Sequence, residues 1–237
     1  MDIPLRPGGP YIETGGAAEP VGTDTMLLAA FADGRGARRA LDLGCGSGAL
    51  ALMLAQDNPS LAADGVELLP QAAQEAERNA ARSGLSGRVR IFCRDLRLFT
   101  ETEAGGKYDL IAANPPYFAE GSGVLPRAPA RAAARYGGRC SFPELAAAAA
   151  RLLRTGGRFC LCFRPERLTE ILRTLSDAGL EPKRLRLAQA DADSPPFLAL
   201  AECRRGGRPG LSAEPALLLR GADGAETPQV RKMYHRE

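Results

Sequence analysis

The residues best suited to chemistry in this chain are Asn114, Pro115, Pro116 and Tyr117, which directly follow the apolar run 108–113. The side-chain carbonyl of Asn114 and the backbone carbonyl of Pro115 can each accept a hydrogen bond from an amine. Two such bonds concentrate the lone pair of a planar amino nitrogen, and the prolines hold the turn rigid. Tyr117 offers a flat face on which a planar target can stack. The turn therefore predicts a site at which a planar amine is the nucleophile.

A glycine-rich loop lies earlier in the chain, between a predicted strand and a predicted helix, and contains Gly44, Gly46 and Gly48. Glycines at this spacing let the backbone turn tightly and approach a ligand at the amino end of a helix. The pattern from Gly44 to Ala49 also fits a dinucleotide fingerprint, so the loop alone does not select a cofactor. Asp42 favours S-adenosylmethionine, because its carboxylate can meet the ammonium group of that ligand or a water beside it.

Acidic residues close the next two predicted strands. Glu67 can accept both ribose hydroxyls of an adenosine-type cofactor. Asp95 can accept from an adenine amino group or cap a short helix over 96–99, and these two roles can coexist. Cofactor contacts are accordingly expected from Asp42, Gly44, Cys45, Gly46, Gly48, Glu67, Asp95, Leu96 and Asn114.

The motifs need a scaffold, and apolar runs that alternate with helical stretches predict one. Strands are expected at 40–43, 63–67, 89–93, 108–113, 158–163, 181–188 and 197–204. Helices are expected at 25–32, 49–56, 69–83, 142–153 and 165–178, with a short turn or helix at 95–99. This alternation predicts an α/β fold with a doubly wound, seven-stranded, mainly parallel sheet, whose ligand sites lie at the carboxyl ends of the strands.

The length of 237 residues suits a single domain over 1–237. Within it we expect an irregular or hairpin-like lead-in over 1–20, an irregular insertion over 118–141 and a weakly patterned C-terminal extension over 205–237. No apolar run approaches the ~20 residues of a membrane helix, and the first residues carry no signal-peptide pattern. The sequence therefore predicts a cytoplasmic protein that does not bind membranes.

Charge and sulfur content narrow the chemistry further. The net charge of +3 is only mildly basic, and the abundance of arginine has two readings, phosphate contact or compositional bias. The six cysteines form no Cys-x-x-Cys pair, which favours buried reduced thiols over a metal site. The sole histidine, His235, lies third from the end and is expected to fray. A mechanism without a histidine base or a metal is favoured, and transfer of an activated methyl group is one.

The order of the motifs resembles the class I S-adenosylmethionine-dependent methyltransferases over residues 20–204. The turn at 114–117 is similar to that of the branch that methylates adenine N6, glutamine N5 or, with Phe last, guanine N2. The segment Val21-Gly22-Thr23-Asp24 resembles the Val-Gly-Thr-Asp segment of the tRNA1(Val) adenine-37 N6-methyltransferases, which helps close over the cofactor. The resemblance thus gives Thr23 and Asp24 a cofactor-binding role. It departs from the family at Gly137, where an acidic residue often follows the Arg-aromatic pair.

The resemblance implies N6-methylation of an adenosine in tRNA, with adenosine 37 of tRNA1(Val) as the expected target. Candidate RNA contacts are Arg127, Arg131, Arg135, Arg204, Arg205 and Arg208. The principal alternative is a glutamine-N5 methyltransferase of release factors, although such enzymes usually carry an amino-terminal helical domain. Other RNA or DNA amino-methyltransferases, a cofactor-binding module without catalysis and a dehydrogenase are weaker alternatives.

Overall fold

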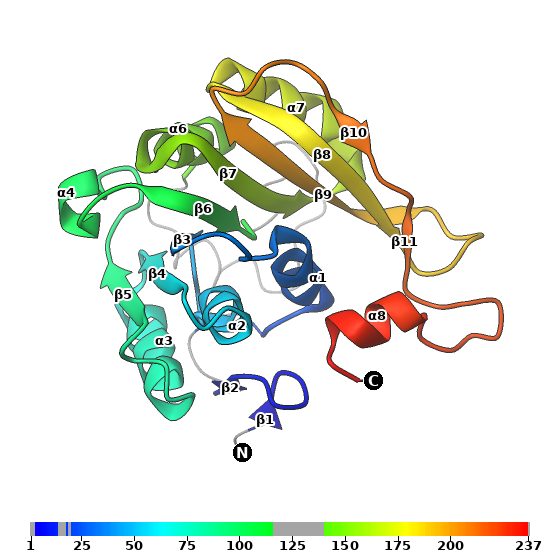
Figure 1. Ribbon diagram of the computed structural model, residues 1–237, viewed down its shortest axis with the longest axis horizontal. Coiled ribbons are helices and arrows are strands. Elements are labelled where there is room, and N and C mark those ends of the chain that lie inside the picture. Colours follow the sequence, from blue (N-terminus) through cyan, green and yellow to red (C-terminus); the bar gives the residue numbers. More distant parts are fainter. Residues whose placement is uncertain (1–2, 14–17, 19, 116–139, 237) are drawn as a thin grey trace, which may run out of the picture.

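The computed structural model describes residues 3–13, 18, 20–115 and 140–236. All seven expected strands are present: β3 (Arg39–Leu43), β4 (Ala62–Glu67), β5 (Val89–Cys93), β6 (Tyr108–Ala113), β7 (Leu153–Phe163), β8 (Leu180–Gln189) and β9 (Pro196–Arg205). They form one sheet in the order β8-β9-β7-β6-β3-β4-β5 (Figure 1). Strand β9 is antiparallel to both of its neighbours, while the other pairings among these seven are parallel. The predicted fold class is confirmed.

Helices cover both faces of the sheet, as Figure 1 shows. One face carries α1 (Thr23–Ala32), α2 (Ala49–Asp57) and α3 (Pro70–Arg82), and the other carries α4 (Glu101–Ala104), α6 (Phe142–Leu152) and α7 (Leu168–Asp177), which follows the single turn η1 (Pro165–Arg167). Each layer buries its own apolar cluster against the sheet. No helix of the described residues is long and apolar enough to cross a membrane.

The boundary between α6 and β7 differs from the prediction. The strand was expected to begin at 158, but β7 begins at Leu153, directly after α6 ends at Leu152, so that Gly156 and Gly157 lie inside β7. The pairing of β7 with β6 shifts register across this stretch, and Gly156 has φ 76°, a left-handed value that glycine tolerates. Leu152 and Leu153 are both fully buried, so apolar periodicity does not mark the boundary.

Helix α4 was not predicted, because four residues are too short to show a period. The short turn or helix expected at 95–99 is a turn at 96–98, and α4 forms after Thr100. Thr100 and Glu103 make a reciprocal capping box, in which each side chain accepts from the backbone N–H of the other residue. The Thr-x-x-Glu spacing was the available signal.

The C-terminal extension is more ordered than expected. Strands β10 (Ser212–Ala213) and β11 (Leu217–Leu218) pair with β8, which makes a nine-stranded sheet, and α8 (Pro228–Met233) packs against α1. Arg184 Nε donates to Glu214 at 2.7 Å, and Arg186 Nη2 donates to Gln229 at 2.8 Å. Two-residue strands carry no periodic signal, which explains the miss.

The lead-in matches the hairpin-like expectation, since β1 (Ile3–Pro4) and β2 (Tyr11–Ile12) pair antiparallel. Asn79 of α3, which is fully buried, accepts from the Glu13 N–H and donates to the Ser47 carbonyl, both at 3.0 Å. The lead-in is thereby fastened beside the glycine-rich loop. The assignment of the whole chain to one domain remains a prediction.

The cysteines are free thiols, but they are not all buried. Cys45, Cys160, Cys162 and Cys203 are buried, whereas Cys140 is half-buried and Cys93 is exposed. Cys160 and Cys162 lie in the same apolar cluster, as strand alternation predicted.

Candidate active site

Three predicted site residues lie close together at the carboxyl ends of three strands, because these strands are neighbours in the sheet. Strand β3 pairs in parallel with β4 on one side and with β6 on the other. Asp42 lies opposite Ala112 of β6. Asn114 is the first residue after β6, which ends at Ala113. Glu67 ends β4. The carboxyl ends of these strands therefore gather the residues that the sequence had separated.

The glycine-rich loop between β3 and α2 has the conformation that only glycine adopts readily. Gly44, Gly46 and Gly48 have φ of 77°, 52° and 81°. The N–H groups of Gly44 and Cys45 both donate to the Val66 carbonyl, at 2.9 and 3.0 Å, which fastens the loop to β4. Among the described residues, no heavy atom lies within 4 Å of a Cβ added at Gly44, so the space beside this glycine is open. The loop can serve as a cradle for a ligand.

Cys45 does not point into this cradle. Its thiol lies over Gly65 of β4, where an added Cβ would come within 2.7 Å of the sulfur. Burial raises the pKa of the thiol well above its usual value, and the charges of Asp42 and Glu67 add to the shift. The backbone N–H of Cys45 is used by Val66 and its carbonyl accepts from Gly48. A cofactor contact from Cys45 stays a prediction, and the described contacts are structural.

Glu67 is held by backbone groups. One carboxylate oxygen accepts from the Gly46 N–H and the other from the Leu69 N–H, each at 2.9 Å. The residue is 9% exposed. A carboxylate has about four acceptor positions, so both oxygens retain capacity for further donors such as ribose hydroxyls. The geometry fits the predicted role.

Asp42 is a buried carboxyl without a cationic partner among the described residues. It is only 3% exposed. Burial raises its pKa to about 7, a backbone hydrogen bond from Ala51 opposes the shift, and the charge of Glu67 adds to it. A cation brought close would stabilise the carboxylate. The site thus suits a ligand with an ammonium group.

Asp95 is already engaged. Its carboxylate accepts from Arg97 through Nε at 2.9 Å and through the backbone N–H at 2.9 Å, and these bonds lower its pKa. Its carbonyl accepts from the N–H groups of Leu98 and Phe99, so Asp95 begins a turn, although 96–99 does not form the short helix that it was expected to cap. An adenine contact stays a prediction and requires Arg97 to share the carboxylate. Leu96 is half-buried and packs against the apolar cluster below α6.

Asn114 is half-buried, and its amide is held from two sides. Nδ2 donates to Thr25 Oγ1 of α1 at 2.9 Å, and the Cys162 thiol of β7 lies 3.0 Å from Oδ1. Neither partner was predicted as a site residue, because contacts between residues so distant in sequence leave no local signal. Pro115 is half-buried beside Asn114, while Pro116, Tyr117, Arg127, Arg131, Arg135 and Gly137 lie outside the described residues.

Thr23 and Asp24 lie in the first turn of α1, the same turn that presents Thr25 to Asn114. Thr23 is exposed and hydrogen-bonds to the Tyr234 hydroxyl. Burial raises the pKa of Tyr234, and the Thr23 bond opposes that shift. A cavity of about 310 Å³ lies between Thr23, Leu5 and Tyr234. The resembling segment therefore lies at the active-site edge, and direct cofactor contact by Thr23 and Asp24 stays a prediction.

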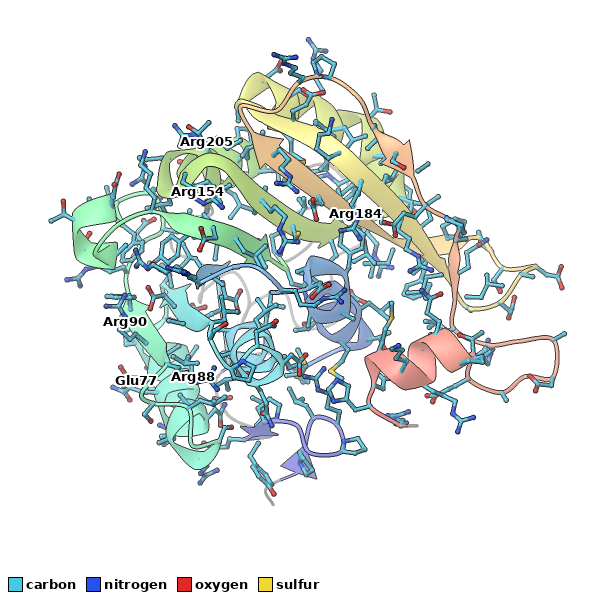
Figure 2. All side chains as sticks on the ribbon, viewed as in Figure 1. Glu77, Arg88, Arg90, Arg154, Arg184 and Arg205 are labelled. Atoms are coloured by element: carbon cyan, nitrogen blue, oxygen red, sulfur yellow. The ribbon has the colours of Figure 1, made fainter. Side chains whose placement is uncertain are left out.

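The arginines near the end of β9 lie beside the starts of the parallel strands, at the end of the sheet opposite the predicted site. Arg204 pairs with Arg158, which pairs with Leu110 near the start of β6. Four residues separate Leu110 from Asn114, or roughly 13 Å along the strand at ~3.3 Å per residue. Arg204 and Arg205 donate to the carbonyls of Gly156 and Leu153. Figure 2 shows Arg205 with Arg154 where β6 and β7 begin. Arg208 is exposed just beyond β9.

Comparison with known families identifies the fold and the group to which the chain belongs. The family model of the methyltransferase small domain matches residues 19–172. The chain belongs to the methyltransferase small domain family. Membership of a methyltransferase family implies S-adenosyl-L-methionine as the methyl donor, and the cradle at Gly44, the buried Asp42 and the fixed Glu67 fit that molecule.

Curated relatives in this family carry a specific name. The tRNA1(Val) (adenine(37)-N6)-methyltransferase of Yersinia enterocolitica is 45% identical over 160 residues, which cover 67% of this chain and 62% of that protein. The tRNA1(Val) (adenine(37)-N6)-methyltransferase of Enterobacter sp. is 44% identical over 177 residues, which cover 74% of this chain and 71% of that protein. The matched region thus spans between three fifths and three quarters of these relatives.

Solved structures share the fold at low sequence identity. A predicted O-methyltransferase from Agrobacterium tumefaciens has a TM-score of 0.72 at 22% identity, covering 90% of this chain and 96% of that one. TrmN from Thermus thermophilus has a TM-score of 0.53 at 22% identity, covering 76% of this chain and 48% of that one. At this identity the likeness shows the methyltransferase fold alone.

Proposed function

We propose that this family member is an S-adenosyl-L-methionine-dependent N6-methyltransferase that modifies adenosine 37 of tRNA1(Val). The observation that carries the proposal is the position of Asn114, at the carboxyl end of β6 and beside the strand that leads into the glycine-rich loop. The names of the relatives support the choice of tRNA. A cytoplasmic location, where tRNA is found, belongs to the same proposal.

The chemistry needs little from the protein beyond position. The cofactor supplies a methyl group that is already activated by the sulfonium, so no strong base is required. Asn114 Oδ1 accepts one N–H of the target amine and the Pro115 carbonyl accepts the other, which directs the nitrogen lone pair toward the methyl carbon. Tyr117 stacks on the adenine, which has to be extruded from its loop to reach the site.

For the RNA we propose a contact surface at the active-site edge. The arginines of the insertion, Arg127, Arg131 and Arg135, follow the catalytic turn directly in sequence. Helix α8 contacts α1, whose first turn lies at Asn114 (Figure 1). Arg231 and Lys232 of α8 are exposed and form no ion pair within the described part of the chain. Arg204, Arg205 and Arg208 lie across the sheet, so in this proposal they bind at most a distant part of the same tRNA.

The reaction is tested with labelled cofactor and transcripts of tRNA1(Val), with the A37→G transcript as matched control. Ribosomal RNA and a release factor complete the set. We expect N6-methyladenosine at position 37 by mass spectrometry, and none in the control. Asn114→Ala should keep cofactor affinity and lose turnover by roughly 100- to 1000-fold, the usual size for one preorganised polar contact. Label on the release factor alone, or normal turnover of the variant, would overturn the proposal.

The RNA surface is tested by paired double variants. Arg231→Ala with Lys232→Ala should weaken tRNA binding and reduce the slope of log affinity against log salt by about 1 to 2, since each lost phosphate contact removes ~0.7–0.9. Arg204→Ala with Arg205→Ala is the matched control, with equal charge removed at the other edge. A larger slope change in the control would place the RNA there instead.

A further inference from the structure

The amide of Asn114 has to hold one orientation for its proposed role. Oδ1 and Nδ2 differ in chemistry but hardly in shape, so a freely rotating amide would present the wrong atom to the target part of the time. A donor N–H turned toward the amine would repel it. Whatever fixes this amide therefore controls how often the site is competent.

Two side chains hold it, one at each polar atom of the amide. Thr25 Oγ1 accepts from Nδ2 at 2.9 Å, and Cys162 is the donor to Oδ1, with the sulfur at 3.0 Å. Thr25 belongs to the first turn of α1, which packs against β7, and Cys162 is fully buried within β7. Both anchors therefore come from the rigid frame of the sheet and its covering helix.

Among the described residues, the hydrogen bonds leave one position of the amide unused on each atom. Oδ1 has two lone pairs, of which the Cys162 thiol engages one, and Nδ2 has two hydrogens, of which Thr25 receives one. A thiol is a weak donor, so it orients the carbonyl without competing strongly for it. A flipped amide would exchange this pairing for Nδ2 against sulfur, which is a weak acceptor.

We propose that Thr25 and Cys162 are positioning residues that lock the Asn114 amide, with one lone pair of Oδ1 left for the N–H of the target amine. This inference rests on the proposed methyl transfer to a planar amine. It gives Thr25 a role separate from those of Thr23 and Asp24 in the same turn. It also gives a buried thiol a task in turnover, although the thiol does not touch the substrate.

The kinetic test uses near-isosteric variants. Thr25→Val and Cys162→Ala should each lower kcat about 10- to 100-fold, the range in which small misplacements of a catalytic group fall. The cofactor Kd and the KM for tRNA should stay within about twofold, because the amide acts on the reacting amine. Thr25→Ser and Cys162→Ser, which keep a hydrogen-bonding group, should recover most of the kcat.

Cys160→Ala is the matched control, since Cys160 is equally buried in the same strand and cluster. A packing defect alone would lower kcat equally in Cys160→Ala and Cys162→Ala, and that outcome would overturn the positioning role of Cys162. Unchanged kcat in Thr25→Val would overturn the role of Thr25.

A readout independent of turnover is the side-chain amide of Asn114 in a ¹⁵N–¹H correlation spectrum, assigned by its loss in Asn114→Asp. Thr25→Val and Cys162→Ala should shift this signal and speed its hydrogen exchange, while Cys160→Ala should not. An unchanged signal in both variants would refute the network. If the signal responds but wild-type protein methylates no adenosine, the network stands and the proposed function fails.

Discussion

Asp42 and Asp64 lie on neighbouring strands of the same sheet and are equally buried, at 3% exposure, yet their surroundings differ. Asp64 accepts two hydrogen bonds from Arg90, at 2.8 and 2.7 Å, and one from the Tyr108 hydroxyl at 2.7 Å. Asp42 has the Ala51 backbone donor and no cation among the described residues. A buried carboxylate costs free energy unless it is paired. At Asp64 the protein offsets this free energy with its own arginine and tyrosine. At Asp42 it does not, and a ligand can supply the positive charge.

Replacing Asp42 should give the largest effect on stability. The folded pKa is about 7 and the unfolded value is 3.8, so folding favours the protonated form. Its contribution to stability is complete below pH 3.8 and is lost as the pH rises through about 7. Asp42→Asn should therefore match wild type near pH 4 and exceed it by up to about 4 kcal/mol above pH 7. Urea unfolding at pH 4 and pH 8 measures this, and cofactor affinity should fall. A destabilised variant at pH 8 would contradict the comparison.

Replacing Asp64 should act in the opposite direction. Asp64→Ala leaves the fully buried Tyr108 hydroxyl without its carboxylate acceptor and removes the carboxylate that pairs with Arg90 and Arg39. Because the Arg90 side chain is 55% exposed and can be hydrated, we expect a loss near the lower end of the buried-pair range, about 3 kcal/mol. Urea unfolding provides the value, and cofactor binding of the folded variant serves as control. Loss of binding without loss of stability would make Asp64 a site residue.

A smaller change separates the Tyr108 hydrogen bond from the arginine partners of Asp64, Arg90 and Arg39. Burial raises the pKa of Tyr108, and the charge and hydrogen bond of Asp64 raise it further, so Tyr108 stays neutral and donates to the carboxylate. Tyr108→Phe should cost about 2 kcal/mol, as expected for a hydrogen bond to a charged group. The thermal midpoint compared with that of Tyr234→Phe, which alters a buried tyrosine whose hydroxyl bonds to Thr23, checks this. Equal shifts would mean that the arginines paired with Asp64, Arg90 and Arg39, stabilise the carboxylate without help from Tyr108.

The smallest effect requires no substitution. If the cofactor ammonium needs the Asp42 carboxylate, wild-type affinity should fall as the pH drops below about 7, approaching tenfold for each unit, or about 1.4 kcal/mol. Calorimetry between pH 8 and pH 6 in two buffers of different ionisation enthalpy would count the proton released. The slope should be flat in Asp42→Asn. A flat slope in wild type would mean that Asp42 does not face the ammonium.

The sequence predicted the sheet and the grouping of Asp42, Glu67 and Asn114, because strand alternation and glycine spacing are local signals that a parallel sheet converts into one shared edge. It did not predict the anchors of Asn114, since Thr25 and Cys162 reach it from 89 and 48 residues away. Nor did it separate Arg204 and Arg205 from the site, because the reversed direction of β9 is not encoded in its own residues. Helix α4 shows the third kind of miss, an element too short for periodicity although its capping box was present.

The exposure of Cys93 makes the molecule a candidate for single-site spectroscopy. The other five thiols are buried or half-buried, and burial raises the pKa of Cys140 to about 11, which slows its alkylation. Cys93 pairs across the sheet with Glu67. A maleimide fluorophore would therefore attach at one position of the native protein, beside the strand end proposed to hold the ribose. Its emission can report ligand arrival in real time, without an engineered cysteine and without any substrate RNA.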